Sequence, residues 1–287
     1  FERARQLEAS GNFAAARSEY LAASDRDELR FRAPQTFNAV IRETAAATGA
    51  TVVDVQAAFA AASSNGIIGA GLMLEHVHPN VEGYFQLASA YFPQLVQWAG
   101  PAAVVVDDAT ARVEIPVTEV DRLHGEYRVA MLKNDWPFVP ERRPTTLPPA
   151  TTRIEEIAQS WFAGRVSWLQ AMNEALVEYQ QQANHAEAAR VAVNVADAIV
   201  NNAESQYTAG RLLLRAEQPE RGLHFLRRAV AIDGAKVEYQ LSLAQAQFML
   251  GRPDESIVTL EAIIARHPED SRAKYWLDEM RRATQSR

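Results

Sequence analysis

The sequence has no cysteine, which excludes a disulfide framework, a thiolate zinc site and a cysteine nucleophile. It also has no apolar run long enough to span a bilayer. Basic residues are fewer than acidic ones: the chain has 29 lysines and arginines and 36 aspartates and glutamates, so its net charge is -7. A chain with this net negative charge shows no basic patch of the kind that binds nucleic acid, so we expect no nucleic-acid partner.

What the chain does contain is typical of a folded protein of two domains. It has 287 residues, of which 48% are hydrophobic and 23% are charged. Most of the hydrophobic residues recur at helical spacing, so we predict a mostly helical protein. The sequence indicates no cofactor.

The C-terminal third repeats itself with a period of 34 residues. Residues 203–236 align with residues 237–270 without a gap, and Pro219 falls over Pro253. A weaker third unit fits residues 169–202. Each unit is patterned as two helices joined by a short polar turn, although a plain helical bundle is the alternative.

These units resemble the tetratricopeptide repeat. Gly251 marks the turn between the helices, and Pro268 ends the unit where that repeat ends. The resemblance implies that residues 151–287 form a stack of helix pairs with a groove that binds a protein partner. Residues 271–287 would be the capping helix of the stack.

The first 28 residues show the same signature. Gly11 takes the turn position, Ala16 the small position and Tyr20 the aromatic position of the repeat. Counting back from Gly11 places the start of this unit ahead of Phe1. We therefore expect residues 1–28 to be a partial helix pair, and the chain to be the C-terminal part of a longer polypeptide.

Residues 29–100 are patterned as the closing unit of an α/β sheet. A helical face over residues 35–48 is followed by a β-branched strand over residues 50–55. A glycine-rich loop and a long amphipathic helix from about Asn80 come next. In open α/β sheets, ligands gather beyond the carboxyl ends of the strands, so a site is predicted in this loop.

The loop holds Glu75, His76 and His78 within four residues. A histidine activates a serine nucleophile when a carboxylate orients its other ring nitrogen. Glu75, three residues before His78, can reach back to Nδ1, whereas we expect the side chains of Glu75 and His76 to diverge. We predict His78 as the base and Glu75 as its orienter. A His-x-His metal site and simple capping of the next helix are the alternatives.

This segment resembles the last block of the SGNH (GDSL-type) hydrolases, in which an acid, two spacers, a histidine and a proline precede the final helix. Residues 75–79 match, with glutamate in place of the usual aspartate. The resemblance is to a bacterial subgroup that carries tetratricopeptide repeats. It implies a flavodoxin-like α/β domain, ester hydrolysis or acyl transfer, and membrane anchoring outside the cytoplasm through a segment ahead of residue 1.

The nucleophile of such a hydrolase is missing from the sequence. No Gly-Asp-Ser occurs, and no glycine and asparagine for an oxyanion hole can be assigned. This chain alone is therefore not a complete hydrolase. Residues 101–150 are predicted to be a linker with an amphipathic helix capped by Thr118. The rival function is a non-catalytic scaffold or assembly subunit, whose repeats bind a protein within a larger membrane-associated assembly.

Overall fold

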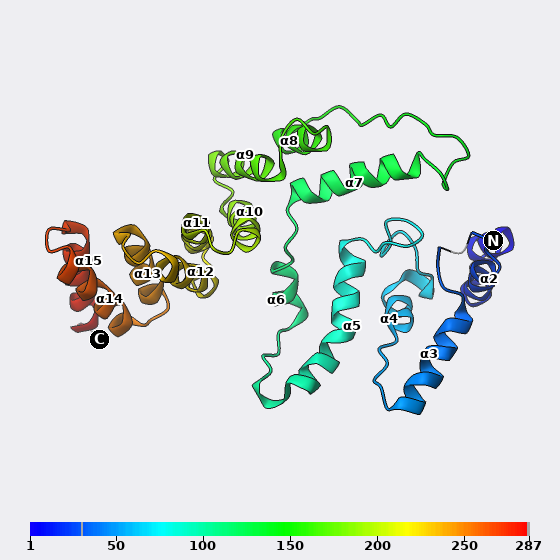
Figure 1. Ribbon diagram of the computed structural model, residues 1–287, viewed down its shortest axis with the longest axis horizontal. Helices are drawn as coiled ribbons and strands as arrows, with labels where there is room; N and C mark the ends of the chain where they lie inside the picture. Colours follow the sequence, from blue (N-terminus) through cyan, green and yellow to red (C-terminus); the bar gives the residue numbers. More distant parts are fainter. Residues whose placement is uncertain (30, 286–287) are drawn as a thin grey trace. The chain divides into compact units, whose positions relative to one another are not determined.

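The computed structural model describes residues 1–29 and 31–285, and nearly all of the regular structure in them is helical (Figure 1). The mostly helical fold predicted from the sequence is confirmed. The chain forms two compact units, Phe1–Ile115 and Pro116–Arg287. No helix in the described part of the chain has the length and apolar character needed to cross a membrane.

The first unit is made of helices and long connections. Its helices are α1 Glu2–Ala9, α2 Phe13–Asp25, α3 Gln35–Thr48, α4 Val55–Ala62, α5 Val81–Ala99 and α6 Asp108–Val113, with 3-10 turns at Ser64–Gly66 and Gly100–Ala102. The pair of α1 and α2 agrees with the helix pair predicted for residues 1–28. Helix α3 ends at Gly49 in the left-handed conformation, as its sequence indicates.

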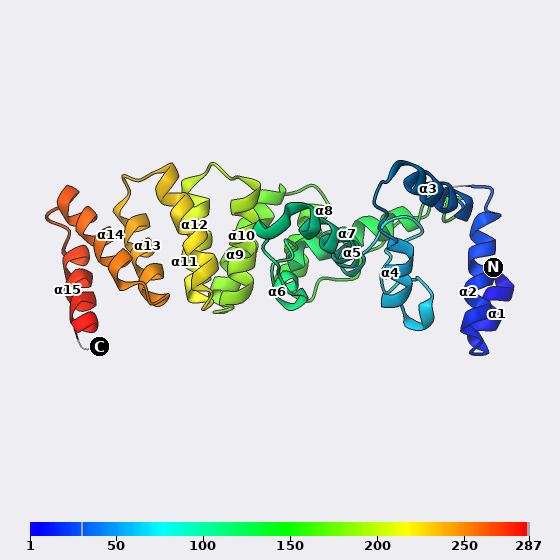
Figure 2. The same cartoon turned by 90° about the horizontal axis from the view of Figure 1, so that it is seen from below.

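The second unit is a series of helix pairs. Its helices are α7 Glu119–Lys133, α8 Arg153–Phe162, α9 Trp168–Gln181, α10 His185–Ala198, α11 Ala203–Arg215, α12 Pro219–Ile232, α13 Val237–Met249, α14 Pro253–Arg266 and α15 Ser271–Gln285. In Figure 2, helices α9 to α15 stand side by side in antiparallel order. The helix boundaries follow the predicted 34-residue units, and α15 is the predicted final helix.

The strand predicted for residues 50–55 is wrong. Residues 50–54 have no regular secondary structure, and α4 begins at Val55. Asp54 caps that helix, because its side chain accepts a hydrogen bond from the Ala57 amide at 2.9 Å. In the described residues the β-structure is limited to an isolated bridge between Met73 and Pro79, so the predicted α/β sheet is not formed. A β-branched run makes a strand only where a second strand pairs with it.

The turns inside the repeats share one backbone conformation. Ala183, Glu217 and Gly251, which are 34 residues apart, all have positive φ, at 53°, 57° and 69°. In each turn the next amide reaches back to the helix, as when Gln218 N–H donates to the Leu213 carbonyl at 2.9 Å. This bond satisfies a carbonyl that would be left without a partner at the helix end. The turn geometry therefore repeats even where glycine does not.

Helices α11 and α12 approach closely through glycine. Gly210 and Gly222 are both buried and face each other across the pair. A Cβ atom built on Gly210 would lie 2.5 Å from Leu226 Cγ, and one built on Gly222 would lie 3.1 Å from the Gly210 carbonyl oxygen. The pair leaves no room for a side chain at either position, and the buried leucines of both helices form the core around them.

Helix α7 belongs to the second unit rather than to a free linker. Thr118 caps it as predicted, and the Asp121 side chain accepts a hydrogen bond from the Thr118 amide at 3.0 Å. The indole of Trp168 on α9 donates to Asp121 at 3.0 Å. The buried residues of α7 share one core with α8 to α11. The domain limits predicted at residues 28, 100 and 150 stay a prediction.

The close contact of α11 and α12 gives a first testable prediction. Gly210→Ala should lower the free energy of unfolding by about 1–3 kcal/mol, because the added methyl group overpacks the Leu226 contact. Gly125→Ala on α7 is the matched control. No atom lies within 4 Å of the Cβ position at Gly125, so alanine there should stabilise by about 0.5–1 kcal/mol. Urea unfolding measures both variants, and an unchanged Gly210→Ala protein would contradict the packing argument.

Candidate functional site

The loop that carries Glu75, His76 and His78 is closed at its base by backbone contacts. Met73 and Pro79 form an antiparallel bridge, and the Leu74 amide donates to the His78 carbonyl at 2.9 Å. The segment between Met73 and Pro79 is too short to adopt an extended conformation. The three ionisable side chains are consequently held within one tight turn.

Asn80 and Gly83 fix this loop to the start of α5. The Asn80 side-chain amide donates to the Gly71 carbonyl at 3.0 Å, and its oxygen accepts from the Gly83 amide at 2.9 Å. The Asn80 amide donates to the Leu72 carbonyl at 2.9 Å. A Cβ atom on Gly83 would collide with that same Leu72 carbonyl oxygen, so only glycine fits there. Asn80 thus caps the helix and anchors the loop together.

The Glu75 carboxylate is the centre of the turn. Its side chain is 1% exposed. Oε1 accepts the His78 amide at 2.8 Å and also contacts Nδ1 of the His78 ring. Oε2 accepts the Val77 amide at 3.0 Å. Two backbone donors and one imidazole therefore converge on one buried carboxylate, which fixes the His78 ring in place.

Both histidines contact this carboxylate. The contact between Glu75 and Nδ1 of His78 is present, and the His78 side chain is 63% exposed. The expectation that His76 diverges from Glu75 is wrong, because His76 Nδ1 lies 2.6 Å from Oε2. The turn is folded rather than extended, and it brings both rings to the same side chain. The ring of Phe31 lies edge-on to His76 at 5.0 Å.

The electrostatics of the turn favour an ionised Glu75. Burial by itself opposes the charged form and raises the pKa of this carboxyl. Hydrogen bonds from the His78 ring and from the His78 and Val77 amides outweigh burial, so the pKa of Glu75 lies below its ordinary value. An ionised carboxylate on Nδ1 favours the tautomer of His78 whose Nε2 carries a free lone pair. This is the arrangement that a general base needs.

Other parts of the predicted site are not brought together. His78 does not lie at the carboxyl edge of a sheet, since the described residues form no sheet. In that same part of the chain, no serine hydroxyl makes a hydrogen bond to His78, and the Ser63 hydroxyl donates to the Phe59 carbonyl at 2.7 Å. No group of three His, Asp or Glu side chains among the described residues could hold a metal ion. The catalytic roles of His78 and Glu75 stay a prediction.

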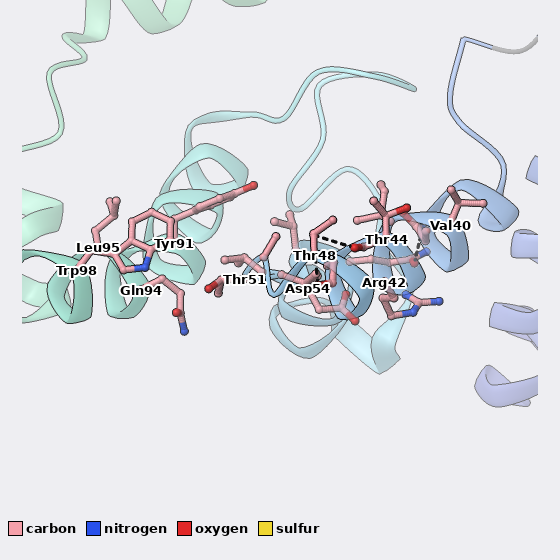
Figure 3. A pocket seen from close by; sticks show the side chains of 18 residues that line it. Val40, Arg42, Thr44, Thr48, Thr51, Asp54, Tyr91, Gln94, Leu95 and Trp98 are labelled. Atoms are coloured by element: carbon pink, nitrogen blue, oxygen red, sulfur yellow. Dashed lines mark hydrogen bonds between the residues drawn. The ribbon is translucent and has the colours of Figure 1, made fainter.

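An apolar groove of about 550 Å³ lies elsewhere in the first unit, between α3, residues 50–56 and α5. Figure 3 shows Tyr91, Leu95 and Trp98 on one side of it and Val40 and Thr44 on the other. Trp98 is 69% exposed. The apolar faces of α3 and α5 predicted from helical spacing are therefore real, but the described residues leave them largely uncovered.

The repeats place the first helix of each pair on one side and the second helix on the other. Rings of Tyr207 on α11 and Tyr239 on α13 are 4.6 Å apart, which joins two first helices. Glu238 on α13 lies 3.8 Å from Arg272 on α15. Glu238 and Arg272 are 34 residues apart, so they hold equivalent positions in neighbouring repeats, and equivalent residues of the first helices follow one another along the stack.

We call two of these rows the first-helix face. They consist of Val177, Arg211 and Gln245 in one row and Gln181, Arg215 and Met249 in the other. Residues four apart on one helix share a side, so the two rows are adjacent. The sequence analysis did not single out these residues. The 34-residue period could have found them, because each row takes the same position in three successive units.

Comparison with known proteins supports the repeat assignment. Residues 213–276 match the tetratricopeptide repeat family. No curated protein sequence matches the chain. A solved structure described as the crystal structure of the P58(IPK) TPR domain is similar, with 14% sequence identity and a TM-score of 0.39. The match covers 99% of this chain and 64% of that one. The hydrolase part of the sequence resemblance stays a prediction.

The buried carboxylate gives the second testable prediction. Glu75→Gln replaces two acceptor oxygens by one, so either the Val77 or the His78 amide loses its acceptor. Hydrogen exchange at these amides should accelerate by about ten-fold or more, the equivalent of losing one hydrogen bond to a charged group. Exchange measured by NMR or mass spectrometry checks this outcome.

Glu43→Gln on the exposed side of α3 is the matched control for this substitution and should leave the loop unchanged. The pH dependence has a defined sign, because the pKa of Glu75 is lowered in the fold. Protection should be fully present above the ordinary value of 4.5 and be lost as pH falls through the lowered value. Protection that is constant to lower pH in both wild type and Glu75→Gln would contradict the geometry.

Proposed function

We propose that this chain is a scaffold or assembly subunit that binds a protein partner through its tetratricopeptide repeats. The observation that carries the proposal is the first-helix face, where three successive repeats present side chains to solvent in register. Val177 is 52% exposed and Met249 is 45% exposed, although both are apolar. Each row has one exposed apolar residue together with an arginine and a glutamine, and methionine and arginine are enriched in protein interfaces.

The match of residues 213–276 to the tetratricopeptide repeat family supports this function. Stacked helical repeats form extended surfaces that proteins use to hold partners, and each repeat contributes the same positions to that surface. A binding role needs no catalytic residue from the chain. It is also consistent with an acidic protein that has no nucleic-acid footprint.

Site-specific photo-crosslinking tests the proposal. A photoreactive benzoylphenylalanine in place of Gln245, on α13, should capture a protein partner in the cells that produce the protein. The matched control carries the same residue in place of Val258, which is exposed on α14. We expect a discrete adduct at Gln245 and at least about ten-fold less at Val258. Equal capture at the two positions, or none at Gln245, would argue against binding through the first helices.

A second candidate function is ester hydrolysis or acyl transfer of the SGNH type. The specific observation in its favour is the turn in which buried Glu75 contacts Nδ1 of the exposed His78. In this candidate, Glu75 orients the ring and His78 takes the proton from a serine hydroxyl that attacks the acyl carbon. The serine and the oxyanion hole would be supplied by polypeptide outside this sequence.

Turnover of p-nitrophenyl butyrate by the protein isolated with its native partners tests this candidate. His78→Ala should reduce turnover by about a thousand-fold or more, because a triad without its base loses most of its catalysis. His185→Ala at the exposed start of α10 is the matched control and should leave turnover unchanged. Equal turnover in wild type and His78→Ala would remove the candidate and leave the scaffold proposal untouched.

A further inference from the structure

Two segments of the first unit are rich in β-branched residues but form no regular structure. Residues 51–53 precede α4, and residues 103–106 lead from the 3-10 turn Gly100–Ala102 toward α6. The amides of residues 51–53 and 104–106 donate no hydrogen bond to any group in the described part of the chain. β-Branched residues whose backbone groups are unpaired are a template for pairing with another strand.

Residues 103–106 are the most exposed apolar segment that the structure describes. Val104 is 79% exposed and Val105 is 71% exposed, and no other large apolar side chain among the described residues exceeds the second value. The segment carries no charge and ends at Asp107, which caps α6. Adjacent exposed valines in an uncharged segment favour pairing with a second backbone.

Residues 51–53 line the apolar groove between α3 and α5. Figure 3 shows Thr51 between Trp98 and Leu95 of α5 and the side chains of α3, among them Val40. Successive side chains of a strand point to opposite faces. A strand that pairs with residues 51–53 would therefore place apolar side chains against both helices and cover the exposed Val40 and Trp98.

The valines of residues 103–106 do not occupy the groove of their own copy. Arg112 on α6 donates to both carboxylate oxygens of Glu82, at 2.6 and 2.8 Å, and its guanidinium carbon lies 3.8 Å from the centre of the Phe85 ring. Glu82 and the groove residue Tyr91 are on opposite sides of α5, because the helix has about 3.6 residues per turn. Helix α6 is thus fixed on the side of α5 that faces away from the groove.

We propose that two copies of this chain exchange these segments, so that residues 103–106 of each copy pair as a strand with residues 51–53 of the other. A copy supplies both halves of the contact, and a two-fold arrangement therefore uses both grooves and covers both pairs of valines. The two halves also match in chemistry. The inserted segment is uncharged, and the charged residues that line the groove are limited to Arg42 and Asp54.

Reciprocity also explains why a second copy is the favoured occupant. A strand of three or four residues is at the short end of the range found in proteins, so a single pairing of this length is weak. Two pairings made at once by the same two molecules strengthen each other. The proposal concerns the first unit and is independent of the partner that the repeats bind.

Sedimentation velocity of the whole chain tests the exchange. The wild type should form a dimer, and Val105→Lys or Val52→Lys should each raise the dimer dissociation constant by about ten-fold or more, because a valine that the contact buries is replaced by a charge. Val258→Lys on α14 is the matched control, since it alters an equally exposed valine outside the two segments and should leave the dimer unchanged.

Mixing the two lysine variants tests reciprocity. A mixed dimer contains one intact exchange, in which residues 103–106 of the Val52→Lys copy pair with residues 51–53 of the Val105→Lys copy. The mixture should therefore dimerise more tightly than either variant by itself. No gain on mixing would contradict the exchange, even where each variant alone weakens the dimer.

Engineered disulfides identify the residues that meet, because the chain has no cysteine of its own. Copies that carry Thr51→Cys and copies that carry Val104→Cys, with different affinity tags, should form a mixed disulfide on oxidation. Thr51→Cys mixed with Val258→Cys should form at least about ten-fold less, because a disulfide needs Cα atoms within about 7 Å of each other.

The remaining outcomes would overturn the proposal. A chain that sediments as a monomer at every concentration excludes the exchange, and a dimer that neither lysine variant weakens has its contact elsewhere. A monomer whose Thr51→Cys forms a disulfide with a different protein in the producing cells would assign the groove to that protein. None of these results bears on the photo-crosslinking at Gln245, so the exchange and the scaffold function fail separately.

Discussion

The stacking of one helix pair on the next is the constraint on which the second unit depends. A single pair cannot bury its apolar face, and only contact with its neighbours completes the core. In α11 and α12 this contact is close enough to exclude every side chain at Gly210 and Gly222. The close approach of α11 and α12 also fixes how the two helices align, because the buried Leu226 side chain fills the space that the glycines leave. The rows on the first helices are a direct result of this register.

Register explains how much of the repeats could be predicted from the sequence. The period located helices α9 to α15, and Gly251 located one turn. It did not show that Ala183 and Glu217 take the same left-handed conformation, because non-glycine residues avoid it at a cost of about 1 kcal/mol. The repeat imposes the turn, and the packing of the two helices outweighs the local preference of the residue.

The candidate site shows where sequence reasoning fails. The contact of Glu75 with His78 follows from spacing in a tight turn, and the structure contains it. The position of His76 could not be predicted, because the bridge from Met73 to Pro79 that folds the turn is not visible as a motif. The strand at residues 50–55 was inferred from β-branched residues. Such residues indicate an apolar environment, whereas a strand also requires a partner for its backbone, and composition carries no information on that partner.

The distribution of arginine links the stability of the array to its recognition. The ion pair of Arg227 with Glu255 joins α12 to α14, and that of Arg281 with Glu261 joins α15 to α14; at the surface each contributes little to stability. Their effect on recognition is larger, because a paired arginine is neutral to an approaching ligand. Arg215, exposed on α11, forms no ion pair in the described part of the chain, so its charge acts on solvent rather than on the neighbouring repeat.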